Sequence, residues 1–475
     1  MIDTQIIRKK IIDLAIRGRL TKQQHGDGSA DDLLRRIQAE KALLINEGKL
    51  KKTKPMPIVS EQEKPFIIPE NWEWARIGDV FTLQSGKNKT ASSISNCRDE
   101  EHKYCCYGGN GLRGYVSEYN VSGEHVLIGR QGALCGNINM AQGDFYATEH
   151  AVVVYTYADV DVKWAAIALK ALNLNQYATS VAQPGLAVGK IEKVLIPLPP
   201  VPEQKRIAQI IESIIAEADI VDNLQHEYSK NMVVIREMII DAGIKGVLTN
   251  QIPEDGTAKE LYKQIQIERN RQEQEKEIKK VELLPDIKDG EEPFNIPDSW
   301  MWTRFGNTSY IVRGGSPRPI KQYITDDPDG INWIKIGDVE KGGKYIYETK
   351  EKIIPEGEKK SRRVSPGDFL LTNSMSFGRP YISKIDGCIH DGWLLIRNLH
   401  GFDDDYLYYL LSSSYMYNEF CLRASGSTVD NLNIEKVSSA FVPLPPIAEQ
   451  RRIVQRIDEL LAALPELKNK GEGTE

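Results

Sequence analysis

A hydrophobic seam that begins after a cluster of prolines constrains the fold of this chain most strongly. Between residues 203 and 241 the seam residues recur at alternating steps of four and three, which is the spacing of a coiled coil. Prolines at positions 197, 199, 200 and 202 end the preceding element, and Glu203 falls in the first helical turn, where its charge suits the helix dipole. The sequence therefore predicts a long rigid helix. Its seam consists of Ile207, Ile211, Ile214, Ala218, Val221, Gln225, Tyr228, Met232, Ile235 and Ile239.

Both ends of the chain repeat parts of this helix. The string PLPPVPEQKRI at 197–207 returns as PLPPIAEQRRI at 443–453, a shift of 246 positions, and the repeated seam continues through Ile453, Ile457, Leu460 and Leu464. The string IIDAGIKGVLT at 239–249 resembles IIDLAIRGRLT at 11–21, a shift of 228 positions. The two terminal segments together form a second, broken copy of the central helix. The chain is therefore predicted to be a closed two-fold repeat.

The segments between these helices predict two further domains. The string KPFIIPENWEWARIG, which contains Trp72, returns 228 positions later as EPFNIPDSWMWTRFG with Trp300. Each copy is followed by short β-rich runs broken by Gly, Asn, Asp and Pro, and then by a helical pattern at 164–174 or 405–420. The predicted fold class is α+β, with two globular α/β domains separated by two long antiparallel coiled-coil helices in a circular pseudo-two-fold repeat.

Five segments follow from these boundaries. Residues 1–60 form an N-terminal helical segment that completes the distal rod, and residues 61–202 form the first domain. Residues 203–290 form the central helical region, residues 291–446 the second domain, and residues 447–475 the distal helix. The charged runs at 33–52 and 260–280 are interpreted as solvated helix faces.

Composition limits the function classes. A net charge of −6 counts partly against a simple basic coat for nucleic acid, because neutralisation of phosphates supplies most non-specific affinity. A DNA-binding protein whose helices dock on protein partners can carry acidic surface on those helices and keep its lysines and arginines on loops. A net charge of −6 is therefore compatible with DNA binding. There is no uninterrupted apolar run long enough to cross a membrane, and the six cysteines form no CxxC pair. We expect a cytoplasmic protein with reduced thiols and no membrane contact.

The duplicated proline boundary, the duplicated IP..W.W.R motif and the first-domain text YGGNGLRGY…VLIGRQGALCGNI…FYATEHAVVV resemble the specificity subunit of type I restriction-modification enzymes over essentially the whole chain. The resemblance implies two target recognition domains, each reading one half of a bipartite site in double-stranded DNA. It also implies helical regions that separate the half-sites and bind two methyltransferase subunits, with ATP-dependent restriction and translocase subunits joining for cleavage. S-adenosylmethionine, ATP and Mg²⁺ then belong to partner subunits, and this chain carries no cofactor.

Direct readout of bases needs side chains with hydrogen-bonding forks on loops, such as Arg for guanine and Asn or Gln for adenine. The two loops QSGKNKTASS and VRGGSPRPIK differ strongly, which suggests two different half-sites. The first-domain candidates for DNA binding are Lys87, Asn88, Lys89, Asn110, Arg113, Arg130, Gln131 and Gln183. The second-domain candidates are Arg313, Ser316, Arg318, Lys321, Asn373, Ser374, Ser376, Arg379 and Thr428.

Catalytic motifs are weak. The amino-methyltransferase tetrad and the GxxxxGK[ST] loop are both absent from the sequence. One alternative is a Mg²⁺-dependent nuclease that uses Asp329, Glu348 and Lys350, and a second is a coiled-coil scaffold with no DNA role. A group of cysteines and histidines lacks the paired spacing of a zinc site, so packing is the favoured interpretation of Cys97, His102, Cys105, Cys106 and His125.

Overall fold

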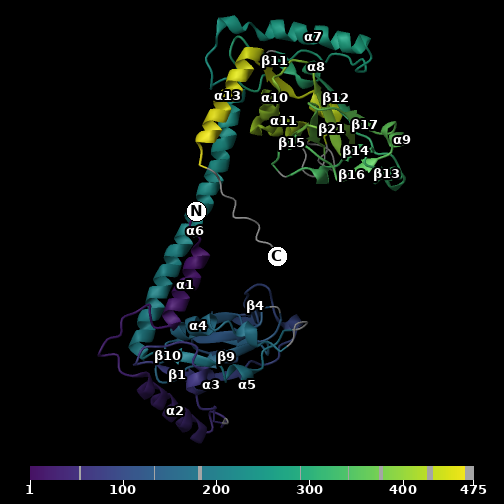
Figure 1. Cartoon of the computed structure of the whole chain (residues 1–475). Helices are drawn as coiled ribbons and strands as arrows, with labels where there is room; N and C mark the ends of the chain where they lie inside the picture. Colours follow the sequence, from purple (N-terminus) through teal and green to yellow (C-terminus); the bar gives the residue numbers. More distant parts are fainter. Residues whose placement is uncertain are drawn as a thin grey trace. The chain divides into compact units, whose positions relative to one another are not determined.

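One helix belongs to both parts of the molecule. The structure is a computed structural model that describes residues 1–52, 55–132, 134–179, 184–288, 290–340, 342–373, 378–424 and 432–465 (Figure 1). The chain forms two compact units, Met1–His226 and Glu227–Glu475. Helix α6, Val201–Ile244, has 44 residues, beginning in the first unit and ending in the second. This element confirms the predicted long central helix.

The first unit contains a domain whose first and last strands pair with each other. Strand β1 (Glu73–Arg76) lies antiparallel to β10 (Leu195–Leu198), with Trp74 opposite Pro197. One sheet has the order β2-β9-β6-β7 and the other has the order β4-β3-β8-β5. Their bounds are β2 Thr82–Ser85, β9 Ala151–Tyr155, β6 His125–Gly129, β7 Ile138–Ala141, β4 Gly111–Val116, β3 Tyr104–Gly108, β8 Asp144–Ala147 and β5 Val121–Ser122.

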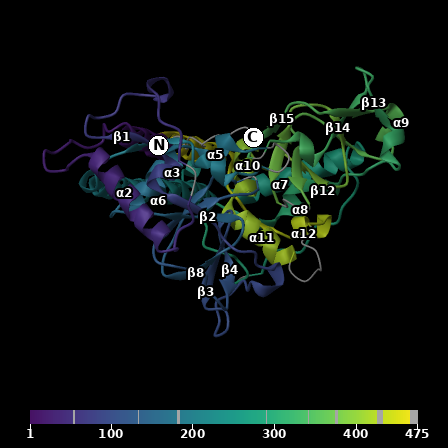
Figure 2. The ribbon, with the colours of Figure 1, turned by 90° about the horizontal axis from the view of Figure 1, so that it is seen from below.

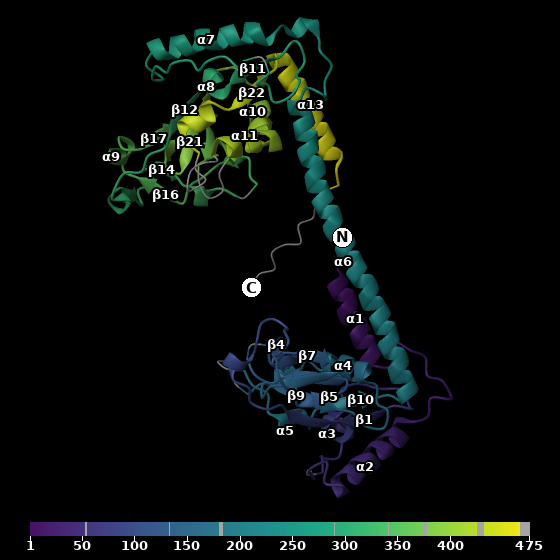
Figure 3. The ribbon, with the colours of Figure 1, turned by 180° about the vertical axis from the view of Figure 1, so that it is seen from behind.

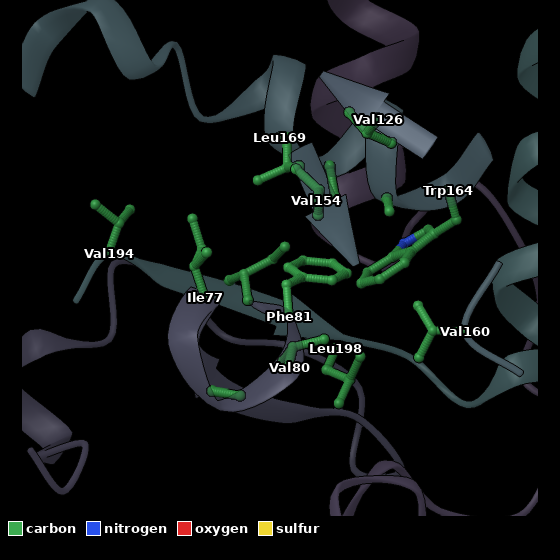
Figure 4. Close-up of a cluster of buried hydrophobic side chains, with 14 of the residues drawn as sticks. Ile77, Val80, Phe81, Val126, Val154, Val160, Trp164, Leu169, Val194 and Leu198 are labelled. Atoms are coloured by element: carbon green, nitrogen blue, oxygen red, sulfur yellow. The ribbon is translucent and has the colours of Figure 1, made fainter. Parts of the chain in front are cut away.

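Aromatic and branched side chains from helices and strands fill the core of this domain. The helices are α3 (Ile77–Val80), α4 (Val162–Ala171) and α5 (Val188–Ile191). Phe81 and Trp164 lie against each other at the centre, with Val126 and Val154 from the sheet beside them (Figure 4). All four side chains are buried, so the sheet and α4 are held together mainly by apolar contact.

The second unit repeats this plan with more strands. Strand β11 (Met301–Arg304) pairs antiparallel with β22 (Phe441–Leu444). One sheet has the order β12-β21-β18-β19-β15 and the other has the order β13-β16-β14-β20-β17. Their bounds are β12 Ser309–Arg313, β21 Trp393–Asn398, β18 Phe369–Thr372, β19 Pro380–Ser383, β15 Tyr345–Ile346, β13 Ile324–Thr325, β16 Glu351–Ile353, β14 Ile331–Ile334, β20 Gly387–Ile389 and β17 Arg362–Val364.

The helix predicted at 405–420 is two helices. Helix α10 (Asp404–Ser412) ends at Ser413, which is extended, and α11 (Ser414–Ala424) starts at the next residue. The Ser413 hydroxyl bonds to the Leu410 carbonyl and accepts from the Met416 amide, so it serves both helix ends. The remaining short helices of the domain are α8 (Phe305–Thr308), α9 (Pro355–Glu358) and α12 (Ile434–Ser438).

The second rod of the prediction consists of two separate shorter helices. In the first unit, α1 (Thr4–Ile16) runs antiparallel to α6 (Figure 3), since Thr4 bonds to Asp222 at 2.7 Å and Arg8 bonds to Asp219 at 2.8 Å. In the second unit, α13 (Ile447–Ala463) lies against the end of α6. Gly243 allows this approach, because a Cβ there would lie 2.7 Å from the Ile457 side chain.

Burial of the seam residues varies along α6. Ile207 and Ile211 are buried in the first unit, Ile453 and Ile457 of α13 are buried in the second, and Ile214, Val221 and Leu460 are half-buried. Tyr228 and Ile235 are 45% and 38% exposed, whereas Met232 between them is buried. Leu464 does not continue the helical seam, because α13 ends at Ala463 and Leu464 is extended.

The charged segments form one helix in each unit, and cations from both helices donate to backbone carbonyls. Helix α2 is Ala30–Asn46, capped by Ser29, and α7 is Ala258–Gln274, capped by Thr257. Lys41 donates to the carbonyls of Gly78, Asp79 and Phe81, and Arg269 donates to the carbonyl of Gly306. These cations therefore serve the carbonyls of the short helices that follow β1 and β11.

A buried glutamate joins each domain to its helix. Glu203 is fully buried and accepts from the Thr21 hydroxyl at 2.7 Å, the Gln23 amide at 2.9 Å and the Trp72 indole at 2.8 Å. The neighbouring Gln204 accepts from the Asp161 amide at 2.9 Å. One residue pair at the start of α6 thus connects the segment after α1, the segment before β1 and the cap of α4.

The second unit builds the same junction with equivalent residues. Glu449 accepts from Thr249 at 2.9 Å, Gln251 at 2.9 Å and Trp300 at 2.8 Å. Gln450 accepts from the amide of Asp403, the cap of α10. The sequence predicts only a favourable position in the helix dipole for Glu203. Its hydrogen bonds show that it is a buried acceptor for three separate side chains.

We expect stability of the first unit to depend on pH through Asp27. Arg206 donates to both carboxylate oxygens of Asp27, at 2.7 and 2.6 Å, and this contact lowers the Asp27 pKa. The resulting stabilisation is present above the ordinary aspartate pKa of ~3.9 and is lost as pH falls through the lowered folded-state pKa. Asp27→Asn should therefore lower the urea midpoint at pH 7, and the difference from the wild type should shrink below about pH 4.

The control is the same substitution at the exposed Asp31, which pairs only with Arg35 on its own helix. Urea unfolding from pH 7 to pH 2.5, followed by tryptophan fluorescence, measures both variants. A difference between Asp27→Asn and wild type that stays constant over this range would contradict the assignment.

Candidate nucleic-acid interface

In the first domain, three loops border a cavity of about 490 Å³. They are the turn between β3 and β4 (both strands are labelled in Figure 2), the segment after β6, and the turn before β9. Asn110, Arg113 and Gln131, all predicted DNA-binding residues, line this cavity together with Gly108, Gly109, Gly111, Gly132 and His150. The fold thus brings together three candidates from two separate parts of the sequence.

Glycines allow these loops to approach each other. A Cβ at Gly129 would lie 2.0 Å from the Gly109 carbonyl oxygen, and a Cβ at Gly86 would lie 2.2 Å from the Ala147 carbonyl oxygen. The Arg130 amide donates to the His150 carbonyl at 2.8 Å, which ties the segment after β6 to the turn before β9. The glycine-rich text of this domain therefore creates close backbone packing around the cavity.

The polar groups at this cavity are available for a ligand. Arg113 and Gln131 are exposed, and neither side chain forms a hydrogen bond or ion pair with another residue in the described part of the chain. Asn110 accepts from Asn137 at 3.3 Å through its side-chain oxygen. Exposed guanidinium and amide groups of this kind are suited to the acceptor-rich edges of bases and to phosphates.

The turn before β9 contributes residues that the sequence analysis did not single out. Thr148 Oγ1, Glu149 Oε2 and His150 Nδ1 are buried atoms with no hydrogen-bond partner among the described residues. His150 lies at the cavity, and its Nε2 is 3.1 Å from Glu149 Oε1. The signal in the sequence was a polar triplet directly before the β-rich run AVVVY.

The remaining first-domain candidates differ in their availability. Lys89 is paired with Glu118 at 2.8 Å and its ammonium lies 5.0 Å from the centre of the Tyr146 ring. Lys87 and Asn88 are exposed, and the Asn88 carbonyl accepts from the Tyr146 hydroxyl. Lys89 therefore has a structural role that the sequence did not predict. Gln183 lies outside the described residues.

In the second domain, four predicted residues converge on Asp391. Its side chain accepts from Ser316 at 2.7 Å and Arg318 at 3.3 Å. Its backbone carbonyl accepts from Arg313 at 3.1 Å and Asn373 at 2.8 Å. The Ser316 hydroxyl is the largest contribution to a lowered pKa of Asp391, so this carboxylate is held in its charged form.

Other second-domain candidates lie apart from this cluster or outside the description. Lys321 and Arg379 are exposed, and the Arg379 amide donates to the Thr372 hydroxyl at 3.0 Å. The remaining candidates lie outside the described residues: Ser374, Ser376 and Thr428.

Glu149 and Asp391 occupy equivalent positions in the two domains. The Gly86 amide donates to Ala151 in the first domain, and the Gly314 amide donates to Trp393 in the second, each at 2.9 Å. Glu149 lies two positions before Ala151, and Asp391 lies two positions before Trp393. Neither acid is predicted from the sequence, because only the strand pairing shows that their turns lie beside the predicted arginine and glutamine residues.

The alternative catalytic and metal sites do not assemble in the described residues. Asp329, Glu348 and Lys350 are all exposed, and Lys350 donates to the Gly337 carbonyl at 3.3 Å. No three cysteine, histidine or acidic side chains gather as a metal site in the described ranges. His102 lies 3.0 Å from Asp99 and His125 bonds to the Val154 carbonyl, while Cys106 is buried.

The molecule is a duplicated recognition scaffold. It has two α+β domains, and each is joined to the long helix and has polar loop side chains gathered beside its strand ends. The family model for the type I restriction modification DNA specificity domain matches residues 69–227 and 310–472. These two matches cover more than half of the chain, one in each unit. The chain therefore belongs to the family of type I restriction-modification specificity subunits.

Similar proteins agree with this assignment. The specificity subunit of the type I restriction enzyme EcoEI from Escherichia coli is 23% identical over 98% of this chain and 90% of its own length. That of EcoAI from Escherichia coli is 25% identical over 97% of this chain and 90% of its own length. The EcoprrI specificity subunit from Escherichia coli is 48% identical, but over 29% of this chain and 34% of its own length.

Solved structures share the fold. The HsdS subunit from Thermoanaerobacter tengcongensis matches with a TM-score of 0.50 and 18% identity, covering 86% of this chain and 95% of that chain. A chain from a study of complex assembly and conformational transition of the type I R-M system matches with a TM-score of 0.56 and 18% identity, covering 84% of this chain and 93% of that chain. The predicted fold class is confirmed.

Family membership decides between the functions considered from sequence. The chain is a non-catalytic specificity subunit, and the catalytic activities of such a system lie in partner subunits. The nuclease alternative therefore lacks support, and a scaffold with no DNA role does not fit the family. Among the described helices, none is both long enough and apolar enough to cross a membrane.

Replacing Asp329 or Glu348 with alanine should leave DNA cleavage by the assembled complex unchanged. Both side chains are exposed and lack the clustered ligands that Mg²⁺ requires. Cleavage assays with each variant, beside the exposed control Asp326→Ala, measure this. Metal-dependent cleavage by the isolated chain that disappears in Asp329→Ala would contradict the prediction.

Proposed function

We propose that each domain reads one half of a bipartite site in double-stranded DNA. The domain at 61–202 would read one half-site and the domain at 291–446 the other. The observation that carries this proposal is the gathering of predicted readout residues at equivalent places in both domains. In the first they surround the cavity next to Glu149, and in the second they surround Asp391.

The domain boundaries support independent half-sites. In each domain the first strand pairs with the last, β1 with β10 and β11 with β22. The chain therefore enters and leaves each domain at neighbouring points. Such a domain is exchangeable without disturbing the helices, because its two connections to them lie together.

The helical regions are proposed to bind two methyltransferase subunits. Among the large apolar side chains exposed on α6, four have a helical spacing that places them along one face of the helix. They are Ile220, Leu224, Val234 and Met238. The junctions at Glu203 and Glu449 are built alike, so two copies of one partner would meet equivalent surfaces.

The cofactors would be bound by the partner subunits. S-adenosylmethionine would bind to the methyltransferase subunits, and ATP and Mg²⁺ would bind to restriction and translocase subunits that join for cleavage. The complex would methylate adenine at both half-sites in the cytoplasm, where chromosomal DNA lies. The role of this chain is recognition and assembly.

Exchange of residues 65–200 for the equivalent segment of a relative tests the proposal. The methylated sites should change in one half only, with the other half and the gap unchanged. The matched control exchanges residues 293–446 and should change the opposite half. Methylated adenines mapped across a genome measure the result, and a change in both halves from either exchange would refute the assignment.

A further inference from the structure

The two units share an aromatic pair where each domain begins. Phe66 and Trp74 meet edge to face with their ring centres 4.9 Å apart. Phe294 and Trp302 do the same at 4.8 Å in the second unit. These residues belong to the duplicated segment at a shift of 228 positions, so the pairs are structurally equivalent.

In the second unit a tyrosine covers this pair. The Tyr415 ring lies 5.0 Å from Phe294 and 5.9 Å from Trp302, centre to centre. Its hydroxyl donates to the Phe441 carbonyl at 2.8 Å, and burial raises the pKa of Tyr415. Tyr415 lies in α11, the helix that continues the chain after α10.

In the first unit the position equivalent to Tyr415 holds no tyrosine, although Tyr177 from the turn that follows it lines the same region. Counted from the matching caps Asp161 and Asp403, the position of Tyr415 corresponds to Asn173. Asn173 adopts a left-handed conformation with φ 45°, and a short turn at Leu174–Tyr177 replaces the second helix. Asn173 is exposed, so its side chain does not cover the aromatic pair.

A cavity of about 630 Å³ remains beside Phe66 and Trp74. Leu172, Tyr177 and Leu195 also line it. Leu195 pairs with Arg76 as Phe441 pairs with Arg304, so the Leu195 carbonyl is the counterpart of the group that accepts from Tyr415. No described side chain donates to it. The size lies within the ~300–1,000 Å³ typical of ligand pockets.

The indole groups of the two pairs differ in their hydrogen bonding. Trp302 donates its N–H to the Phe294 carbonyl at 3.2 Å. The N–H of Trp74 is buried and has no partner among the described residues. A ring that presses on Phe66 and Trp74, as Tyr415 does on their counterparts, would favour the same bond in the first unit.

Positive groups lie around the cavity. Arg76 is buried and is held by Glu63 at 2.7 Å and by the Lys193 carbonyl at 2.8 Å, so its charge is compensated. The exposed Lys190 and Lys193 also line the cavity. The Arg17 guanidinium lies 4.6 Å from the centre of the Phe66 ring, as the Lys245 ammonium lies 5.6 Å from that of Phe294 in the second unit. The aromatic and aliphatic side chains of the lining suit an aromatic ring with one hydroxyl.

We propose that this cavity binds a tyrosine side chain from a partner protein. The ring would lie on Phe66 and Trp74, and the hydroxyl would donate to the Leu195 carbonyl. The partner is the methyltransferase subunit, and that identity rests on the proposed function. The second unit carries the corresponding tyrosine in its own chain, so the two units would engage their partners differently at this place.

The side-chain analogue p-cresol tests the cavity in the full-length protein. It should bind at one site in the wild type, and Tyr415→Gly should add a second site by opening the equivalent space. Crystallographic difference density and calorimetric stoichiometry measure both. Binding to Tyr415→Gly in the second unit, with no binding beside Trp74, would overturn the proposal.

A second experiment uses the assembled complex. Ala171→Phe places a ring into the cavity and should weaken partner binding about ten-fold, while Lys170→Phe adds the same ring at an exposed neighbouring position and should not. A photo-crosslinking residue at position 176 should capture a tyrosine-containing peptide of the methyltransferase.

The outcomes separate this inference from the proposed function. A complex that assembles normally with Ala171→Phe and methylates both half-sites would overturn the tyrosine site alone. Crosslinks confined to this chain within an active complex would do the same. Loss of the bipartite methylation pattern in the domain exchanges would overturn the proposed function, whatever p-cresol does.

Discussion

Removal of residues 226–232 from helix α6 should shorten the gap between the two half-sites by about 3 base pairs and leave both half-sites unchanged. Seven helical residues span ~10 Å at ~1.5 Å each, and base pairs are spaced by ~3.4 Å. The prediction treats the continuous helix, which begins in one unit and ends in the other, as the element that fixes the gap.

The deletion removes the buried Met232 but keeps the contact of Gln225 with the N-terminal segment and the register of the seam. Gln225 still accepts from the Ile2 amide, and the seam step from Gln225 to Ile235 becomes three residues, so the apolar face stays in register. Removal of residues 226–229 is the control. Each helical residue turns by ~100°, so losing four residues rotates the apolar face of the rest of the helix by ~40°. This rotation should damage assembly. An active, folded seven-residue variant with an unchanged gap would exclude the helix as a ruler.

Glu203→Leu should destabilise the first unit by about 3 kcal/mol, because it leaves several buried donors without an acceptor. Glu203 accepts from Thr21, Gln23 and Trp72 and is fully buried. A loss of this size raises the unfolded fraction by roughly a hundred-fold. Glu203→Gln should lose less, because one amide oxygen still accepts a bond.

Two matched variants locate the effect. Glu449→Leu removes the equivalent acceptor and should destabilise the second unit by a similar amount, whereas Glu217→Leu changes an exposed residue of α6 and should cost little. Hydrogen exchange followed by mass spectrometry reads each unit separately. Equal protection in Glu203→Leu and wild type would show that the junction does not hold the domain.

These contacts explain the structural role of the duplicated string at the proline boundary. Its prolines end β10 and β22 and its Glu-Gln pair forms the two junctions. A domain joined in this way can vary freely in its loops, since the junction uses residues from its edges and its flanking helices. The same arrangement explains why the candidate readout residues differ between the two units while the joints match.

The recognition loops could be predicted from sequence, but their groupings could not. Gly, Asn and Arg between β-rich runs identified Asn110 and Arg318 as exposed loop residues, whereas the exposed Arg113 lies in strand β4. Composition gave no means of placing Asp391 among them, because the contacts join residues more than seventy positions apart. It likewise could not show that Lys89 is paired with Glu118.

The sequence by itself determined the repeat, the long helix and the division into two α+β domains, because each depends on local periodicity or on direct comparison of two strings. Only the tertiary structure decided where the two parts of the broken second rod begin and end, that Ile235 stays exposed, and that Tyr415 packs on Phe294 and Trp302 while a cavity lies beside Trp74. Those features depend on which surfaces meet. A pattern along one segment specifies which face is apolar, and the partner that covers this face is set by packing between segments far apart in the chain.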